Sequence, residues 1–425
     1  MSPLPRRAGA ALLAPAAAVL AALCCAPAPA AASAPARPTG FGIAAAPSAA
    51  QPHWACPRGL CDAIVDPGPG TAAGRQAAVF AKRKPEGGGE EGGIDPEELR
   101  AAYSIPATGG TGQTIAVIEA FSYKQAEKDL AKYRSHYGLP ACTAASGCLK
   151  VVNAAGEAPA NHGFTEWEPE VALDLDMASA ACPECHLLLV SAEAETWKTL
   201  GAAVNRAAAM GATEISNSYG LAEGTCEAEC SQAAPDWNHQ GIFVTVSSGD
   251  YGYNNELVFE ASPSFPASLP TVAAVGGTAL RHAKGKRGFT EKVWGERGLG
   301  IGTGSGCSVQ PKPSWQTDSG CAGRTENDVA AVAACATPVS VFDSTEGGWI
   351  DLCGTSASSP LVAGIEAHAS ASTRALPGGE AFYSEGALFD VKGGSNGRCT
   401  TRYLCHGEPG YDGPTGLGTP NGPLP

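Results

Sequence analysis

The sequence predicts an α/β protein in which a mostly parallel sheet carries helices on both faces. Short, almost wholly apolar runs alternate with longer segments of helical spacing, and strands buried on both faces of a parallel sheet have that composition. Of the 425 residues, 44% are hydrophobic, so the chain can bury a large core. The 54 glycines and 33 prolines therefore predict many turns, not disorder over most of the chain.

The predicted elements follow one another in the order that such a sheet requires. Apolar runs of strand length are separated by segments whose apolar residues recur at helical spacing. In these sheets, active sites lie at the carboxyl ends of the strands. We expect helices over 125–137, 168–181 and 197–210, and strands over 114–120, 149–153, 186–191, 214–218, 242–247 and 271–275.

The chain begins with the pattern of a secretory signal. Arg6 and Arg7 precede an apolar run over 8–25, and small residues and prolines follow. A membrane anchor is the alternative, but the run is short and Pro15 interrupts it. We expect a signal peptide over 1–32, a low-complexity leader or propeptide with an exposed linker over 33–93, and one folded domain over 94–425.

Charge and hydropathy limit the partners. The net charge of −14 argues against a nucleic-acid partner, because proteins that bind nucleic acids usually carry a basic patch on their surface. After the signal, no stretch stays apolar for the roughly 18 residues of a membrane span, so we expect no membrane partner.

The cysteines indicate an oxidising compartment. Two of the sixteen lie in the signal, and the other fourteen come in close pairs that favour disulfides. A zinc site is the alternative at Cys182-x-x-Cys185-His186, although a second such pair is missing. The expected pairs are Cys56/Cys61, Cys142/Cys148, Cys182/Cys185, Cys226/Cys230, Cys307/Cys321, Cys335/Cys353 and Cys399/Cys405.

Ser356 is a candidate nucleophile. It follows a Gly-Thr turn and precedes an Ala-rich helical stretch over 361–369, so it lies near a helix N-terminus. A hydroxyl on such a turn has backbone N–H groups nearby that can hold an oxyanion. The alternative is that Ser356 only caps the helix.

Three acidic residues are candidates for proton transfer. Glu170 and Asp174 are four residues apart in a largely apolar helical segment, so both carboxylates lie on one face. Two such acids repel each other unless they share a proton. Asp250 ends a predicted strand at the carboxyl edge of the sheet, where a turn or helix cap is the alternative. His162 is the best histidine candidate for a base, in a polar Asn-His-Gly loop.

Taken together, these motifs resemble those of the sedolisins, the serine-carboxyl peptidases. The resemblance runs from about residue 95 to the end of the chain, with the motifs in the family's order, and it implies a subtilisin-like fold. The motifs are Glu170-x-x-x-Asp174, Ser248-Gly-Asp250, Gly354-Thr-Ser356-Ala-x-x-Pro360, Ser216-Asn-Ser-Tyr-Gly220, Phe265-Pro-Ala-Ser268, Val275-Gly-Gly-Thr278 and Lys312-Pro-Ser-Trp315.

The resemblance assigns a role to each candidate. It implies that Ser356 is the nucleophile, Glu170 the general base and later acid, and Asp174 the residue that orients Glu170. Asp250 would stand where subtilisins use an amide side chain in the oxyanion hole. A carboxylate base suits an acidic working pH, and Asp250 can donate a hydrogen bond only when protonated.

The resemblance also implies one calcium ion near the C-terminus. The matching residues would be the carboxylates of Asp390 and Asp412 with the carbonyls of Val391, Glu408 and Gly410. With water, this set forms the six-oxygen shell that calcium prefers. An ordinary loop rich in glycine, proline and acids is the alternative.

Two departures from the family pattern concern the leader and one strand. Only about 60 residues separate the signal from the folded domain, fewer than a separately folded propeptide would need, and Tyr219 stands where the family usually has tryptophan. We expect a secreted, monomeric endopeptidase acting on protein or peptide substrates at acid pH after loss of residues 1 to about 93.

Three alternatives stay open at this stage. The first is a subtilisin-type enzyme, which would need a histidine motif early in the fold. The second is a catalytically inactive secreted binding protein, which would not need the four candidate residues Glu170, Asp174, Asp250 and Ser356. The third alternative is an enzyme that removes tripeptides from the N-termini of its substrates instead of cleaving internal bonds.

Overall fold

The computed structural model describes residues 53–54, 60–62, 64–66, 87–163, 165–255 and 262–425. The chain divides into Met1–Ala46, none of which is described, and Pro47–Pro425. The predicted signal peptide over 1–32 therefore lies outside the described residues.

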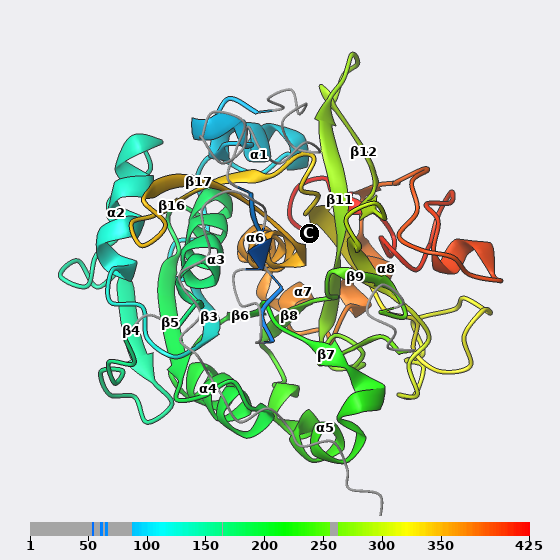
Figure 1. The fold of residues 1–425 in the computed structure, drawn as a ribbon, viewed down its shortest axis with the longest axis horizontal. Helices are drawn as coiled ribbons and strands as arrows, with labels where there is room; N and C mark the ends of the chain where they lie inside the picture. The colour runs from blue at the N-terminus through cyan, green and yellow to red at the C-terminus, as the bar shows by residue number, and fades with distance from the viewer. Residues whose placement is uncertain (1–52, 55–59, 63, 67–86, 164, 256–261) are drawn as a thin grey trace, which may run out of the picture. The chain divides into compact units, whose positions relative to one another are not determined.

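A large, mostly parallel sheet forms the centre of the second unit (Figure 1). Its strands run parallel in the order β4-β5-β3-β6-β8-β11-β15, and β12 pairs antiparallel with β11. They are β3 (Thr114–Ala120), β4 (Leu149–Asn153), β5 (His186–Ala192), β6 (Glu214–Asn217), β8 (Phe243–Ser247), β11 (Ala273–His282), β12 (Phe289–Val293) and β15 (Val329–Val332). This confirms the predicted α/β fold class with a mostly parallel sheet.

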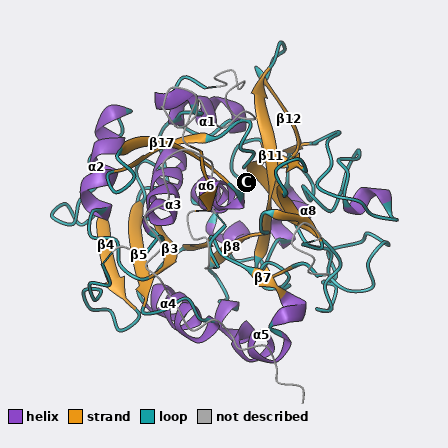
Figure 2. Cartoon of the chain, in the orientation of Figure 1, coloured by secondary structure: helices purple, strands orange, loops and turns teal. Residues whose placement is uncertain are grey.

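Helices cover both faces of this sheet, as expected (Figure 2). The strands lie between α3 and α6 on one side and α4 on the other. The helices are α1 (Pro96–Tyr103), α2 (Ala126–His136), α3 (Glu168–Ala181), α4 (Trp197–Ala209), α5 (Glu227–Ala233), α6 (Thr355–Glu366), α7 (Ala371–Arg374) and α8 (Glu380–Glu385). The three helices expected from spacing all form.

A second sheet includes part of the leader. Its order is β1-β2-β17-β16, and β2 pairs antiparallel with the end of β17. Part of the predicted low-complexity leader over 33–93 therefore takes part in a sheet, because residues 64–66 pair with β17. The strands are β1 (His53–Trp54), β2 (Ile64–Asp66), β16 (Val339–Asp343) and β17 (Gly348–Cys353).

Shorter strands complete the described part of the chain. They form three small sheets that connect the loops around the main sheet. These are β7 (Leu221–Ala222) with β10 (Ser264–Phe265), β13 (Gly295–Glu296) with β14 (Ile301–Ser305) and β9 (Tyr251–Tyr253), and β18 (Leu388–Phe389) with β19 (Thr419–Pro420).

Six of the seven predicted disulfides form. They are Cys142–Cys148, Cys182–Cys185, Cys226–Cys230, Cys307–Cys321, Cys335–Cys353 and Cys399–Cys405. Cys61 is disulfide-bonded too, while Cys56, its expected partner, lies outside the described residues. The zinc alternative at Cys182 and Cys185 is excluded, because their sulfurs are bonded to each other.

Helices α3 and α6 are buried along their whole lengths and lie side by side (Figure 1). A helix buried on all sides belongs to a core. α6 begins at Thr355, six residues before the expected stretch, because Pro360 lies inside the helix and interrupts its sequence pattern. Ser356 thus lies within the first turn of α6.

The close approach of α3 and α6 depends on Gly364. A Cβ added there would lie 2.5 Å from the Cβ of Ala181 and 3.2 Å from the carbonyl oxygen of Ala178. Both contacts are on α3, the helix that carries Glu170 and Asp174. The two helices can therefore pack at this distance only with glycine at position 364.

We expect Gly364→Ala to destabilise the protein, although alanine usually favours a helix by about 1 kcal/mol over glycine. Forcing the helices apart should lower the free energy of unfolding by about 1–3 kcal/mol. The control is Gly298→Ala, where an added Cβ meets nothing within 4 Å. Urea unfolding measures both, and a stabilised Gly364→Ala variant would contradict the packing argument.

Candidate functional site

The four predicted chemical residues come together at the carboxyl edge of the main sheet. Glu170 and Asp174 lie one turn apart on α3, Ser356 lies in the first turn of α6, and Asp250 follows β8. All four are 0% exposed. The structure thus brings together residues that are up to 186 positions apart in sequence (Glu170 to Ser356).

The turn before Ser356 is shaped by Gly354. Its φ of 118° lies in a region that side chains disfavour. A Cβ there would also lie 2.6 Å from Oδ2 of Asp250. The Ser356 hydroxyl lies 3.5 Å from the carbonyl oxygen of Ser218, at the end of β6. Glycine therefore leaves open the space between the serine and Asp250.

Glu170 lies beside Ser356. Burial raises its pKa well above the usual value, repulsion from Asp174 raises it further, and the nearby Ser356 hydroxyl lowers it in part. Neither carboxylate oxygen of Glu170 has a hydrogen-bond partner, so its contact with Ser356 falls short of full hydrogen-bond geometry. Such contacts often tighten only when substrate binds.

Asp174 is held by a serine on the neighbouring strand end. The Ser218 hydroxyl lies 2.8 and 2.9 Å from the two carboxylate oxygens of Asp174. Burial raises the Asp174 pKa to about 7, and the hydrogen bonds from Ser218 moderate that increase. Asp174 therefore links Glu170 to a further buried acid.

That further acid, Glu119, was not among the predicted site residues. It lies near the end of β3, is 0% exposed and contacts Asp174. Burial raises its pKa well above the usual value, followed by repulsion from Asp174 and Glu170. The signal in the sequence was an acidic residue at the carboxyl end of an apolar strand.

Asp250 presents one free oxygen toward the serine turn. Its Oδ1 accepts hydrogen bonds of 2.8 Å from both the backbone N–H and the hydroxyl of Thr355. Its Oδ2 is buried without a partner. Burial raises the Asp250 pKa well above the usual value, and Asp62 adds repulsion. A protonated Oδ2 could donate to an oxyanion formed beside Ser356.

His162 does not reach the serine. Its ring packs edge-on against Phe121, at 5.4 Å between centroids, and its Nε2 lies 3.6 Å from the Glu193 carboxylate. It lies on the loop before α3. Of the residues predicted as bases, Glu170 and not His162 lies beside Ser356.

The predicted calcium residues also lie close together. Asp390 Oδ1 accepts a 3.1 Å hydrogen bond from the N–H of Gly410, so the two loops are in contact. Asp412 is 0% exposed and its oxygens accept from the backbone of Glu408 and Thr415 at 3.0 and 2.9 Å. The Glu408 carboxylate pairs with Arg402, which leaves its carbonyl as the group that could bind a metal.

Two observations fit a cation between these loops. Burial raises the pKa of Asp412 to about 7, and repulsion from Asp390 contributes, so two acids face one another. Among the ion pairs of the described residues none involves Asp412, whereas Asp390 pairs with Lys392 at 3.0 Å. Among the described residues, the metal-type ligand atoms that gather within 4.8 Å of one another belong to Cys399, Cys405 and His406, and two of these form a disulfide.

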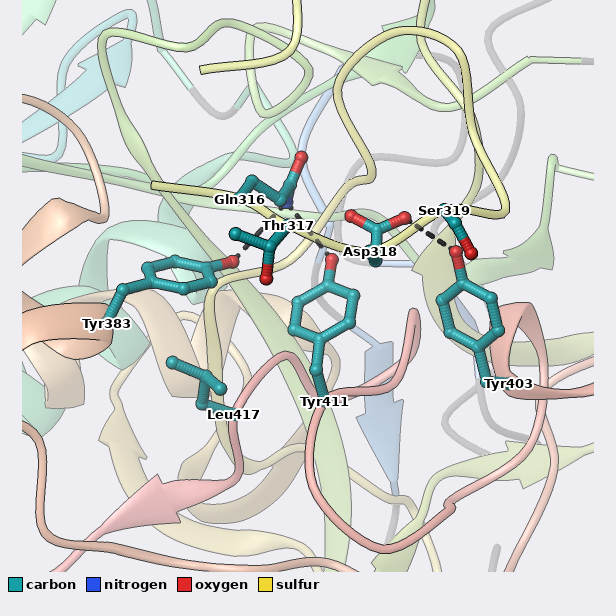
Figure 3. A pocket seen from close by; sticks show the side chains of 8 residues that line it. All are labelled: Gln316, Thr317, Asp318, Ser319, Tyr383, Tyr403, Tyr411 and Leu417. Atoms are coloured by element: carbon teal, nitrogen blue, oxygen red, sulfur yellow. Dashed lines mark hydrogen bonds between the residues drawn. The ribbon is translucent and has the colours of Figure 1, made fainter. Parts of the chain in front are cut away.

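Tyr411 anchors the 408–412 loop in a neighbouring pocket (Figure 3). Its hydroxyl accepts a 3.1 Å hydrogen bond from the Gln316 amide and donates one of the same length to the carbonyl oxygen of Asn327. Tyr383 and Tyr403 line the same pocket, with Tyr403 donating to Asp318. None of the four chemical residues lines it.

A sequence profile described as the subtilase family, Peptidase_S8, matches residues 153–377. That match covers more than half of the chain and includes all four chemical residues. The chain belongs to the subtilase family. The sedolisin of Pseudomonas sp. (strain 101) is 29% identical to this subtilase over 361 residues, which are 77% of this chain and 60% of the relative.

Two further relatives support the resemblance to sedolisins. Kumamolisin of Bacillus sp. (strain MN-32) is 29% identical over 354 residues, or 77% of this chain and 62% of the relative. A solved structure described as Pseudomonas sedolisin, a serine-carboxyl proteinase complexed with two molecules of pseudo-iodotyrostatin, matches with a TM-score of 0.66 and 28% identity. It covers 79% of this chain and 96% of its own. The predicted membership among the sedolisins is confirmed.

The subtilase spans about 60% of the length of the two curated relatives described here. Within its described part, no helix has both the length and the apolarity that crossing a membrane requires.

The acid cluster makes the stability of this subtilase depend on pH. The folded pKa values of Glu119 and Glu170 lie well above 4.5, and that of Asp174 is about 7 instead of 3.8. Between the usual pKa values of these acids, about 4, and their raised values in the folded protein, the native chain binds more protons than the unfolded chain. The contribution of these three acids to stability is therefore complete below about pH 4 and decreases as the pH rises toward 7 and beyond.

We expect Glu119→Gln to weaken this pH dependence, because the amide cannot ionise. Each proton retained only by the native chain changes the free energy of unfolding by about 1.4 kcal/mol per pH unit. Urea unfolding at about pH 4.5 and 7.5 compares the variant with the parent and with Glu227→Gln, an exposed acid on α5. Equal pH dependence in all three proteins would contradict the buried cluster.

Proposed function

We propose that this chain is a secreted serine-type endopeptidase that hydrolyses peptide bonds at acidic pH. One observation carries the proposal: Ser356, Glu170 and Asp174 lie together with an unpaired, buried Oδ2 of Asp250. A nucleophile, a proton acceptor and an oxyanion donor are the three parts that acyl transfer needs.

In the first step, the Ser356 oxygen attacks the carbonyl carbon of the substrate while Glu170 takes the serine proton. Asp174, held by Ser218, orients Glu170 and shares its proton. Glu170 then returns the proton to the leaving amine, and a water molecule hydrolyses the acyl-enzyme with the same residue as base. This sequence uses one carboxyl group as base and then as acid.

Asp250 stabilises the negative charge that develops on the carbonyl oxygen. Thr355 fixes one of its oxygens through two hydrogen bonds, which leaves Oδ2 to carry the proton. Because burial raises the pKa of this carboxyl group, it can stay protonated under conditions where an exposed aspartate ionises. An oxyanion donor of this kind typically contributes about 10²–10³ in rate.

The proposed acidic working range follows from these two acids. Glu170 must be able to lose a proton to the site while Asp250 keeps one, so activity should be bounded on both sides. The six disulfides and the signal-like start of the chain support an extracellular location. An inactive binding protein is not favoured, because it would not require all four groups.

We expect Ser356→Ala and Glu170→Gln to abolish hydrolysis of an unfolded protein substrate at about pH 4. Ser356→Ala removes the nucleophile, and the amide of Glu170→Gln cannot accept its proton. Product peptides are measured by mass spectrometry at about pH 4 and pH 8, with urea unfolding as a check on folding.

Two controls accompany these variants. Ser358→Ala removes a hydroxyl from the same turn of α6, and this variant should retain activity. The Ser358 hydroxyl donates a 2.8 Å hydrogen bond to the carbonyl oxygen of Thr355. Asp176→Asn changes a buried acid on α3 that accepts a hydrogen bond from the Phe342 N–H instead. Full activity of Glu170→Gln, or activity of the parent at pH 8 alone, would overturn the proposal.

We further propose that one calcium ion binds between the loops of Asp390 and Asp412. The carboxylates of these two residues, with the carbonyls of Val391, Glu408 and Gly410, would hold it. A bound calcium ion supplies positive charge between two facing acids and stabilises the loops. Tyr411 would transmit this stability to the pocket around Gln316.

We expect a chelator, or Asp412→Asn, to lower the melting temperature of the protein. A ligand that binds only the native state at a hundredfold excess over its Kd adds about 2.7 kcal/mol of stability. The Ser356→Ala background prevents self-digestion during the measurement. Addition of Ca²⁺ should restore the melting temperature and addition of Mg²⁺ should not. A melting curve unchanged by the chelator would exclude the site.

A further inference from the structure

A short segment of the leader lies against the proposed catalytic residues. The N–H of Asp62 donates a 3.3 Å hydrogen bond to the carbonyl oxygen of Ser218, and the N–H of Gly220 donates 2.9 Å to that of Leu60. Cys61 and Tyr219 are antiparallel partners. Residues 60–62 therefore extend along the end of β6, which also supplies Ser218 to the site.

The same segment continues along the strand that leads to the nucleophile. Ile64 pairs antiparallel with Cys353, and the pairing continues through β2 and β17. β17 ends directly before Gly354, Thr355 and Ser356. Residues 60–62 thus pair with the end of β6 and residues 64–66 pair with β17, in the way that extended peptides bind to sheet edges.

The carbonyl group of Asp62 is the one presented to the catalytic residues. A Cβ on Gly354 would lie 2.1 Å from the Asp62 oxygen, 3.1 Å from its carbonyl carbon and 2.6 Å from Oδ2 of Asp250. The Asp62 oxygen and the unpaired carboxyl oxygen therefore adjoin the same point on the turn that carries Ser356.

The Asp62 side chain fills a buried pocket. It is 3% exposed, and its Oδ2 accepts a 2.9 Å hydrogen bond from the hydroxyl of Ser247, at the end of β8. The titratable groups that face it are Glu170 from α3, Asp250 after β8 and Glu326 before β15. Burial raises the Asp62 pKa to about 7, so at acid pH the side chain is neutral.

We propose that Leu60, Cys61 and Asp62 occupy the acyl side of the substrate cleft, and that the pocket at Ser247 selects a short, neutral, hydrogen-bonding side chain before the cleaved bond. Protonated aspartic acid and asparagine are the side chains of this class. The bond after Asp62 is then the chain's own substrate. This inference rests on the proposed peptidase function and specifies its substrate class.

The chemistry of the self-cleavage is that of any other substrate. The Ser356 oxygen forms an ester bond with the carbonyl carbon of Asp62 as the amide C–N bond breaks. Glu170 transfers the serine proton to the departing amine. One water molecule then hydrolyses the ester, which frees the Asp62 carboxylate and restores the serine.

The pocket disfavours other classes of side chain for physical reasons. A leucine side chain would leave the Ser247 hydroxyl without its buried partner, and an unpaired buried polar group is costly. A lysine side chain would bury a positive charge, and its ammonium group cannot accept the hydrogen bond that the Ser247 hydroxyl donates. Ser247 is thus a specificity-determining residue and takes no part in the bond-breaking steps.

The first experiment uses the full chain, incubated at about pH 4. The parent should give a new N-terminus at the residue after Asp62, read by N-terminal sequencing and intact mass. Ser356→Ala should give none, Asp62→Asn should be cut there, and Asp62→Lys should be cut there at least about tenfold more slowly. Cleavage of the parent elsewhere but never after Asp62 would overturn the inference and leave the peptidase function standing.

The second experiment does not depend on how the leader folds. Quenched peptides spanning residues 58–66, with serine in place of Cys61, carry Asp, Asn, Leu or Lys at position 62. The mature enzyme should cleave the Asp and Asn peptides at least about tenfold faster in kcat/KM, and Ser247→Ala should reduce the rate for Asp by roughly twofold to tenfold. Faster cleavage of the Lys or Leu peptide would overturn the proposed selectivity. No hydrolysis of any peptide or protein would instead overturn the peptidase function.

Discussion

The structure depends on the burial of several carboxyl groups close together, away from water. Glu119, Glu170 and Asp174 come from β3 and α3 and meet where α3 packs on α6. Burial and mutual repulsion raise their pKa values, so the three carboxyl groups are not all ionised at once and share protons instead. The same burial that makes the acids useful for proton transfer therefore makes the fold itself sensitive to the proton concentration.

The packing around these acids leaves little freedom. Gly364 lets α6 approach Ala178 and Ala181 closely, and Gly354 lets the chain turn directly into α6. Both positions need glycine for space, and Gly354 also for its φ of 118°. The serine is thus fixed relative to Glu170 by the contact between two buried helices, and relative to Asp250 by a single turn.

Periodicity and apolar runs predicted the elements that hold the site, but not all of its residues. The strand over Thr114–Ala120 and the helix over Glu168–Ala181 form with the predicted bounds because their composition suits only buried elements. The predicted helical stretch began at residue 361, six residues after the actual start of α6, because Pro360 interrupts the helical pattern. Glu119 and Asp62 could not be placed from sequence, since each becomes part of the site only through pairing with distant segments. Asp62 in addition lies in a stretch whose composition is that of a linker.

The raised pKa of Asp62 bears on how the leader segment leaves the cleft. Burial raises that pKa to about 7, so the segment binds best when Asp62 is protonated and less well as the pH rises through 7, where Asp62 and Asp250 would repel each other. The proposed peptidase activity also requires acid conditions, because Asp250 must keep its proton. Occupancy of the cleft and catalysis are therefore favoured over the same pH range. A segment that leaves the cleft on acidification would instead bind less well at acid pH than at neutral pH. Acidification alone would hold this segment in place, so its removal under working conditions has to proceed through cleavage, as expected of a substrate rather than of a pH-released inhibitor.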